Sequence, residues 1–406
     1  MSKGKKTLIL ISAVLLLSLM LSSCNLFGPG DQTTGGDSTD GTLPYSETSS
    51  APDSSNTTAP DTDETTSPET GVSTGTSPVD TTGEVTTEPV PVQTYLNPLT
   101  GLEVEKDLRR VIPISIVLDN LSLAVPQSGI SRADIVIEVL AEGGITRLIM
   151  ITNDYVGSEV YGPVRSTRHY MVSLSQAFGT LMVGAGGSPL GYTMIQSLGL
   201  PYLDGVNDPY SGLGFYRDPL RLESSGASHS LMTNGERILK LAAKHDWTTT
   251  TSSDIRTVFN FGGGQRYTGV ATHVCIPYSS SQYVQMIYSP TTNTYYRYQL
   301  GDRAHIDAEN GEQLNFTNVF ILFAETESIP DDTEGRLDVV TTGEGSGYYI
   351  SDGSYMPIRW SRIGDTSSFI FTDESGAVIS VNKGKTFISV APKWIEGQVE
   401  LNYKAD

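Results

Sequence analysis

Cysteine is scarce in this chain, with Cys24 and Cys275 the two examples among 406 residues. The N-terminal sequence predicts that Cys24 carries a lipid, which leaves Cys275 unable to form an internal disulfide. Cys275 lies in the apolar run THVCIPY, a context that favours a buried small hydrophobe over a reactive thiol. A disulfide-stapled fold is therefore excluded.

Basic residues are missing from a long stretch, because no Lys or Arg occurs between Lys6 and Lys106. Residues 25–94 are mostly Thr, Ser, Asp, Glu, Gly and Pro, and they include twelve acidic residues. This composition cannot bury enough apolar surface to offset the entropy of ordering. We predict that residues 24–94 form a disordered tether, whose roughly 70 flexible residues span about 45–50 Å.

The chain also lacks the motifs that bind common cofactors and polyanions. Its formal net charge is −20, whereas nucleic-acid binding requires clustered Lys and Arg, so no nucleic-acid partner is expected. The glycine-rich GAGGSP has Pro189 in the third glycine position of a dinucleotide fingerprint, and no P-loop lysine follows it. The five histidines show no paired metal-ligand spacing. We expect neither a cofactor nor a metal.

Long apolar runs are equally rare, and the one near the N-terminus is too short to span a membrane. It extends from about Leu8 to Leu21, follows three lysines, and ends in the sequence Leu21-Ser22-Ser23-Cys24. This pattern predicts a lipoprotein signal peptide at residues 1–23, with cleavage before Cys24 and acylation of its sulfur. The alternative is an ordinary signal peptide that happens to contain a cysteine. We expect a protein anchored through Cys24 at the outer face of the cytoplasmic membrane, with its folded part exposed in the cell envelope.

The folded part is long enough for two domains, and its predicted pattern of secondary structure changes near Phe261. Helical and strand patterns alternate before this point, and short aromatic strands dominate after it. We predict an N-terminal α+β domain at 95–255 and a smaller β-rich domain at 256–406. Antiparallel hairpins and separate helices favour the α+β class over a parallel α/β fold.

Charged residues interrupt the apolar stretch EVLAEGGITRLI at residues 138–149. The Gly143-Gly144 pair predicts a two-residue hairpin turn. That register places Glu138, Glu142 and Arg147 on one face, with the arginine diagonal to both carboxylates. Two interpretations stay open. The charges pair with one another and are purely structural, or they belong to a polar site.

Further polar residues favour a site. In GPVRSTRHY, the spacing of Arg165 and Arg168 predicts that both lie on one face at the start of a helix, where basic side chains call for anionic partners. Those partners are Glu138 and Glu142, or the carboxylate or phosphate of a ligand.

Two more candidates come from other segments. Asp119 ends a predicted strand, and His229 lies in a small-residue loop before a helix. Such a histidine is either a general base or a hydrogen-bonded loop residue. The complete set of candidate ligand-binding residues is Asp119, Glu138, Glu142, Arg147, Arg165, Arg168 and His229.

Several phrases resemble the YerB-like family of bacterial lipoproteins, found in Gram-positive-type bacteria: NPLTGL at 97–102, DN at 119–120, PQSGISRADIVIEVLAEGGITR at 126–147, GPVRSTRHY at 162–170 and DESGAVISVNKGKTFISVAP at 373–392. Phe387 and Ser389 depart from the residues expected there. The resemblance implies a layered β-β-α sandwich in the first domain. It supplies no catalytic residues, because the family is largely one of unknown function.

Two functions remain from the sequence. The first is an envelope lipoprotein that binds a cell-wall component or an envelope protein. The second is an envelope hydrolase or transferase that acts on a glycan or peptide through Asp119, Glu138 or Glu142, and His229. The position of Arg147 beside the glutamates opposes a raised carboxyl pKa and favours binding over catalysis.

Overall fold

The computed structural model describes residues 92–402, except 158 and 281. The predicted signal peptide, Cys24 and nearly all of the predicted tether lie outside this range. Within it, no helix combines the length and apolar character needed to cross a bilayer.

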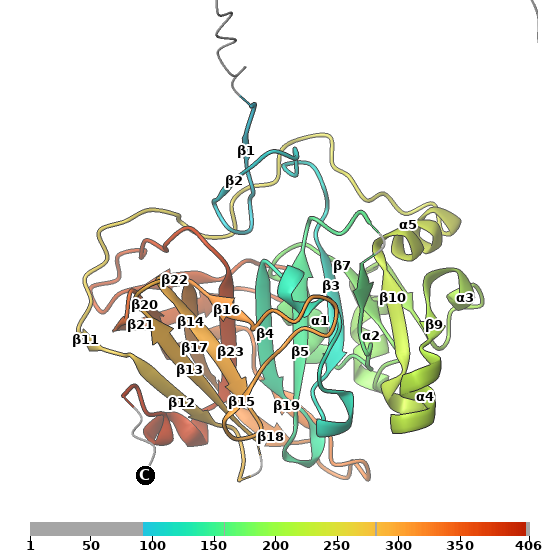
Figure 1. Ribbon diagram of the computed structural model, residues 1–406. Coiled ribbons are helices and arrows are strands. Elements are labelled where there is room, and N and C mark those ends of the chain that lie inside the picture. Colours follow the sequence, from blue (N-terminus) through green and yellow to red (C-terminus); the bar gives the residue numbers. More distant parts are fainter. Residues whose placement is uncertain (1–91, 158, 281, 403–406) are drawn as a thin grey trace, which may run out of the picture. The chain divides into compact units, whose positions relative to one another are not determined.

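Eleven strands of the described chain form one mixed sheet, in the order β11-β21-β20-β17-β23-β4-β5-β3-β7-β8, with β22 paired to β21 (Figure 1). In that order the strands are Gly269–Val270, Ser354–Arg362, Gly343–Ser351, Asn318–Ala324, Thr386–Pro392, Ile135–Leu140, Thr146–Thr152, Ile114–Asp119, Leu181–Gly184 and Tyr202–Asp204, and β22 is Ile370–Thr372. Strand β23 pairs in parallel with both β17 and β4, so strands of both halves of the sequence share this sheet. We keep the division into domains at 95–255 and 256–406 as a proposal.

Smaller sheets contain most of the remaining strands. One joins β12, β13, β14, β15 and β16, which are His273–Pro277, Tyr283–Ser289, Thr294–Gln299, Arg303–Ala304 and Asn315–Phe316. A second joins β6, β10 and β9, which are Val160–Tyr161, Leu231–Asn234 and Tyr216–Arg217. Two short pairs complete the set: β1 and β2 at Tyr95–Leu96 and Glu103–Val104, and β18 and β19 at Thr326–Ser328 and Leu337–Val339.

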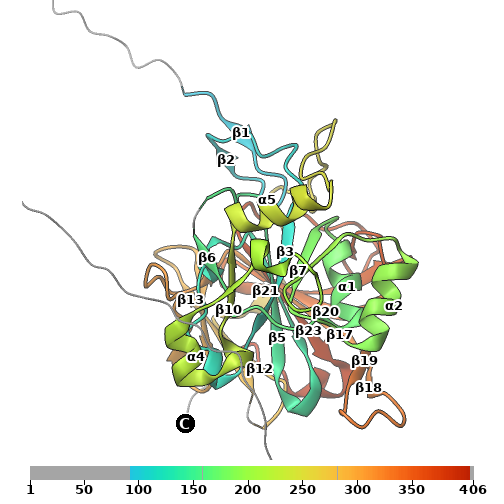
Figure 2. The same ribbon diagram turned by 90° about the vertical axis from the view of Figure 1, so that its right-hand side faces the viewer.

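Helices lie on both sides of the sheet. They are α1 (His169–Gln176), α2 (Pro189–Ser197), α3 (Ser211–Gly214), α4 (Pro219–Ser225) and α5 (Gly235–Lys244). Figure 2 shows α1 and α2 on one side of β3, β5 and β7, with β6, β10 and α4 on the other. The predicted α+β class and the layered β-β-α arrangement are confirmed.

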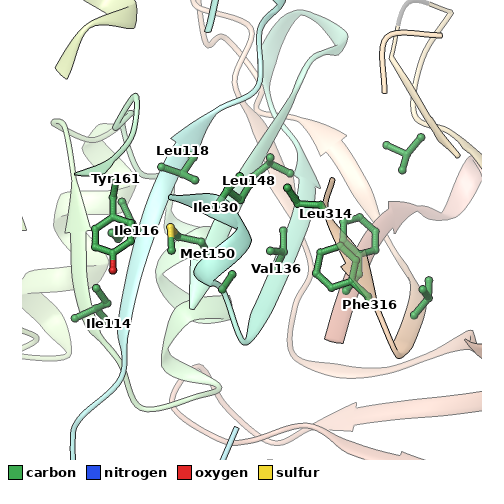
Figure 3. Close-up of a cluster of buried hydrophobic side chains, with 14 of the residues drawn as sticks. Ile114, Ile116, Leu118, Ile130, Val136, Leu148, Met150, Tyr161, Leu314 and Phe316 are labelled. Atoms are coloured by element: carbon green, nitrogen blue, oxygen red, sulfur yellow. The ribbon is translucent and has the colours of Figure 1, made fainter. Parts of the chain in front are cut away.

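Two hydrophobic cores lie on opposite faces of the main sheet. Val136, Leu148 and Met150 face the core shown in Figure 3, which the smaller sheets and α5 cover. Ile137 and Val139 face the second core, which includes Tyr170 and other residues of α1. Every residue of β3, β4 and β5 is buried, which explains why these strands read as continuous apolar runs with charges inside them.

The predicted register of the β4–β5 hairpin is wrong by one residue. The turn contains three residues, Glu142–Gly144, so Glu138 lies opposite Leu148 and Val139 lies opposite Arg147. Because side chains alternate along a strand, this slip moves Arg147 to the face opposite Glu138. The predicted pairing of these two side chains is therefore also wrong.

The predicted helical start around Arg165 is wrong too. Helix α1 begins at His169, with Arg168 as its N-cap. Arg165 lies before the helix, where its N–H donates to the Val117 carbonyl and its own carbonyl accepts from the N–H of Ala185. These bonds bridge β3 and the end of β7, so Arg165 belongs to an extended segment inserted between the ends of these two neighbouring strands.

Candidate functional site

Asp119, the last residue of β3, lies among three basic side chains. Its Oδ2 is 2.6 Å from Nδ1 of His229, which comes from the short 3-10 turn Ala227–His229. Its Oδ1 is 3.3 Å from NH1 of Arg147, the residue directly opposite on β5. Nε of Arg165 lies 3.3 Å from Oδ2. Four of the candidate residues from distant segments thus meet at one carboxylate.

A second ion pair lies at the start of α1. The guanidinium of Arg168 donates from Nε and NH2 to both carboxylate oxygens of Glu142, in the turn between β4 and β5. Burial raises the pKa of Glu142, but the hydrogen bonds and charge of Arg168 outweigh it and lower that pKa. We call Asp119, Glu142, Arg147, Arg165, Arg168 and His229 together the arginine cluster.

The arginine cluster holds more positive than negative charge, with three arginines against two carboxylates. Burial lowers the pKa of Arg147, and the nearby charges of Arg165 and Arg168 lower it further against the opposing effect of the two carboxylates. Among the described residues, the buried Nε atoms of Arg147 and Arg165 have no hydrogen-bond partner. The Arg165–Asp119 contact is thus an ion pair by distance that is not aligned as a hydrogen bond. Because these N–H donors lack acceptors and the cluster has an excess of positive charge, the arginine cluster is suited to bind an anion.

One side of the arginine cluster reaches solvent. The side chain of Arg165 is 22% exposed, whereas that of Arg147 is 3% exposed. NH1 of Arg165 donates to the Ser228 carbonyl over 3.0 Å, and the exposed Arg217 donates to the Ala227 carbonyl. Two arginines therefore hold the loop that carries His229, and Arg165 joins the buried carboxylate to the surface.

Glu138, by contrast, lies in a separate buried network. Its Oε2 accepts a hydrogen bond from NH2 of Arg297 over 2.7 Å, and both side chains are fully buried. Its Oε1 accepts from the hydroxyl of Thr146 over 2.6 Å and from the amide of Asn120 over 3.3 Å. Of the seven candidates, Glu138 is the one that the fold does not bring to the arginine cluster.

The partners of Glu138 were not predicted from the sequence. Arg297 also donates to Nδ1 of His305, whose Nε2 lies 2.7 Å from the side-chain oxygen of Gln127. Burial and the charge of Arg297 hold the pKa of His305 well below its usual value. The local feature that pointed to Arg297 was its position as an arginine within the alternating strand TYYRYQ. Phe387, which departs from the family pattern, lies under the Arg297 guanidinium at 5.7 Å.

Other parts of the described chain are weaker candidates for a functional site. No group of His, Cys, Asp and Glu among the described residues could hold a metal ion. Burial raises the pKa of the Cys275 thiol to about 11, which disfavours its reactive thiolate. An apolar cavity of about 220 Å³ is lined by Phe259, Phe369 and Phe371, and a second of about 20 Å³ lies beside Lys385. Neither cavity is lined by the arginine cluster.

Known proteins resemble the chain over most of the described range. Residues 99–248 match the family model described as a protein of unknown function (DUF3048), N-terminal domain, and residues 274–388 match its C-terminal domain. The "Putative lipoprotein YerB" of Bacillus subtilis (strain 168) is 29% identical over 298 residues, which cover 73% of this chain and 86% of that protein. The crystal structure of YerB from Bacillus subtilis, at 28% identity, covers 75% of this chain and 99% of its own, with a TM-score of 0.65. The chain belongs to the YerB-like family of unknown function.

Proposed function

We propose that this protein is a lipid-anchored binding protein of the cell envelope, and that the arginine cluster binds an anionic group of a cell-wall polymer. The observation that carries the proposal is the excess of arginine charge around Asp119, with two buried guanidinium Nε atoms left without hydrogen-bond partners. An anion at Arg165 would supply both the missing charge and an acceptor.

Because the rest of the chain is acidic, the local excess of arginine charge favours anions that fit this site over polyanions in general. A formal charge of −20 repels polyanions at long range, so general charge attraction would not produce binding. Arg165 connects the buried cluster to solvent and is the most exposed of its three arginines. An anionic group of an envelope protein is the competing ligand.

Anchoring is supported by the lysine-rich start, the short apolar run and Cys24, and by the name of the Bacillus subtilis relative. Its test is the variant Cys24→Ala in cells that are fed labelled palmitate. We expect the wild-type chain to carry label and to sediment with membranes, and the variant to do neither. Equal labelling of both would contradict acylation at Cys24.

Binding is tested with the full chain in detergent, by calorimetric titration with a glycerol-phosphate oligomer and, separately, an acidic peptide. We expect Arg165→Gln to lose at least tenfold in affinity for the oligomer. Arg359→Gln is the matched control, because Arg359 is 60% exposed and belongs to β21, outside the cluster. Equal affinities of the two variants, or binding of the peptide alone, would contradict a wall-polymer site at Arg165.

A further inference from the structure

We propose that the arginine cluster also hydrolyses a phosphodiester, with His229 as the general base and Asp119 as the residue that positions it. This inference rests on the proposed function, because the arginines that bind the anionic group would hold the diester beside the histidine.

The arrangement of Asp119 and His229 is that of an oriented acid–base pair. Because a carboxylate oxygen accepts, the 2.6 Å contact between Oδ2 and Nδ1 makes Nδ1 the donor, and in a neutral imidazole the lone pair then lies on Nε2. The carboxylate is itself fixed, since its Oδ1 accepts from the Leu121 N–H over 3.1 Å and from Arg147 over 3.3 Å. Nε2 of His229 has no hydrogen-bond partner among the described residues, and the side chain is 10% exposed. Nε2 is therefore available to water.

Arg165 would bring the anionic group to the loop that carries His229. Its NH1 donates to the carbonyl of Ser228, the residue before His229, so the guanidinium and the imidazole are held by one loop. A fork of N–H donors matches the oxygens of a phosphate, and its charge stabilises negative charge that develops on them. Substrate and base would thus be positioned by the same contact.

The charges select the substrate class. A phosphodiester stays anionic throughout hydrolysis, whereas a peptide or a carboxylic ester offers no ground-state charge to the arginines. Glycoside hydrolysis needs two free carboxyl groups, one of them protonated. Here the bonds of Arg168 lower the pKa of Glu142, and Asp119 lies among three basic groups. The glycan and peptide substrates expected from the sequence are therefore less suited to this site than a phosphodiester.

The reaction needs water and no other co-reactant. Nε2 of His229 accepts a proton as the water oxygen forms a bond to phosphorus. The bond between phosphorus and the ester oxygen breaks on the opposite side of the phosphorus, and the departing oxygen takes a proton from a solvent water. The products are a phosphate monoester and an alcohol, and His229 returns to its neutral form by giving its proton to the solvent.

The experiment measures release of p-nitrophenolate from bis(p-nitrophenyl) phosphate by the full chain, alongside calorimetric binding of the glycerol-phosphate oligomer. We expect the wild type and Arg359→Gln to turn over equally. His229→Gln should lose at least a hundredfold in rate while it keeps its affinity for the oligomer. If His229→Gln does not fold, Arg165→Gln takes its place, and its turnover must fall with its affinity.

The outcomes separate this inference from the proposed function. A wild-type chain that binds the oligomer without releasing p-nitrophenolate above the buffer rate would overturn the hydrolytic role and leave the binding role intact. Full turnover by folded His229→Gln would overturn it as well. A wild type that binds no oligomer would instead contradict the proposed function.

Discussion

Glu138 of β4 and Arg297 of β14 form a 2.7 Å ion pair in which neither side chain reaches solvent. They are 159 residues apart and come from the two halves of the sequence. The same network includes Asn120, which donates to Glu138 and is the chain neighbour of Asp119 in the arginine cluster. The pair thus joins the two halves on the face of the sheet opposite to that of Arg147.

Removal of one partner of this pair should destabilise the fold strongly. In Arg297→Met, Glu138 would keep a buried charge without a counterion, at a cost of about 3–5 kcal/mol in the free energy of unfolding. Urea denaturation followed by circular dichroism would measure this loss. Glu344→Gln is the control, because Glu344 pairs with Arg359 at 3.6 Å on the surface and should change stability by at most about 0.5 kcal/mol.

The double variant Glu138→Gln/Arg297→Met tests the cause. Since it removes both charges, it should be more stable than Arg297→Met alone. A double variant that is less stable than either single one would show that packing, and not the unpaired charge, dominates the loss.

The strands were more predictable from the sequence than their partners. The strand that ends at Asp119 and the hairpin around Gly143 follow from apolar runs and turn residues. The register did not, because both Gly143 and Gly144 adopt positive φ and Glu142 joins them in a three-residue turn. A shift of one residue in a turn moves every side chain that follows to the other face of the sheet. The hairpin was therefore predicted correctly, but the ion pair across it was not.

The arginine cluster was partly predictable for a similar reason. The residue types were recognisable, since charges in apolar strands and arginines near a helix start both call for partners. Which partner each charge takes depends on contacts across more than a hundred residues, as between Asp119 and His229. No local pattern encodes such a contact, and for this reason Arg297 was not predicted as the partner of Glu138.

Arg147 and Arg165 should differ in their effect on stability although both contact Asp119. Arg147 is almost fully buried, so Arg147→Ala removes a counterion from a buried carboxylate, at about 3 kcal/mol or more. Arg165 is partly exposed and not aligned as a hydrogen bond to Asp119, so Arg165→Ala should cost about 1 kcal/mol. Thermal unfolding midpoints would show the difference. A larger loss for Arg165→Ala would contradict the assignment of Arg165 to ligand binding.

His305 should make the protein less stable in acid. Its pKa in the folded state is well below the value of about 6.5 in an unfolded chain, so below pH 6.5 the unfolded state binds the proton and the folded state does not. The free energy of unfolding therefore falls as the pH drops below about 6.5, by at most about 1.4 kcal/mol per pH unit. Above that pH this effect vanishes.

The variant His305→Gln isolates this contribution. Urea denaturation of the wild type and the variant between pH 4.5 and 7.5 would compare the two slopes, and contributions from other groups cancel in the difference. We expect the stability of the variant to vary less steeply with pH below 6.5. Parallel curves would mean that His305 takes up its proton in the folded state.

Gly129 and Gly143 form a matched pair for the cost of a side chain at positive φ. Their φ angles are +74° and +71°, but a Cβ on Gly129 would lie 2.3 Å from the Val160 carbonyl oxygen, whereas one on Gly143 would meet nothing within 4 Å. Gly143→Ala should thus lose about 1–2 kcal/mol from backbone strain alone. Gly129→Ala must also displace the backbone of β6, so its denaturation midpoint should fall well below that of Gly143→Ala. Equal midpoints would show that β6 moves aside at little cost and that Gly129 is present for its backbone angle alone.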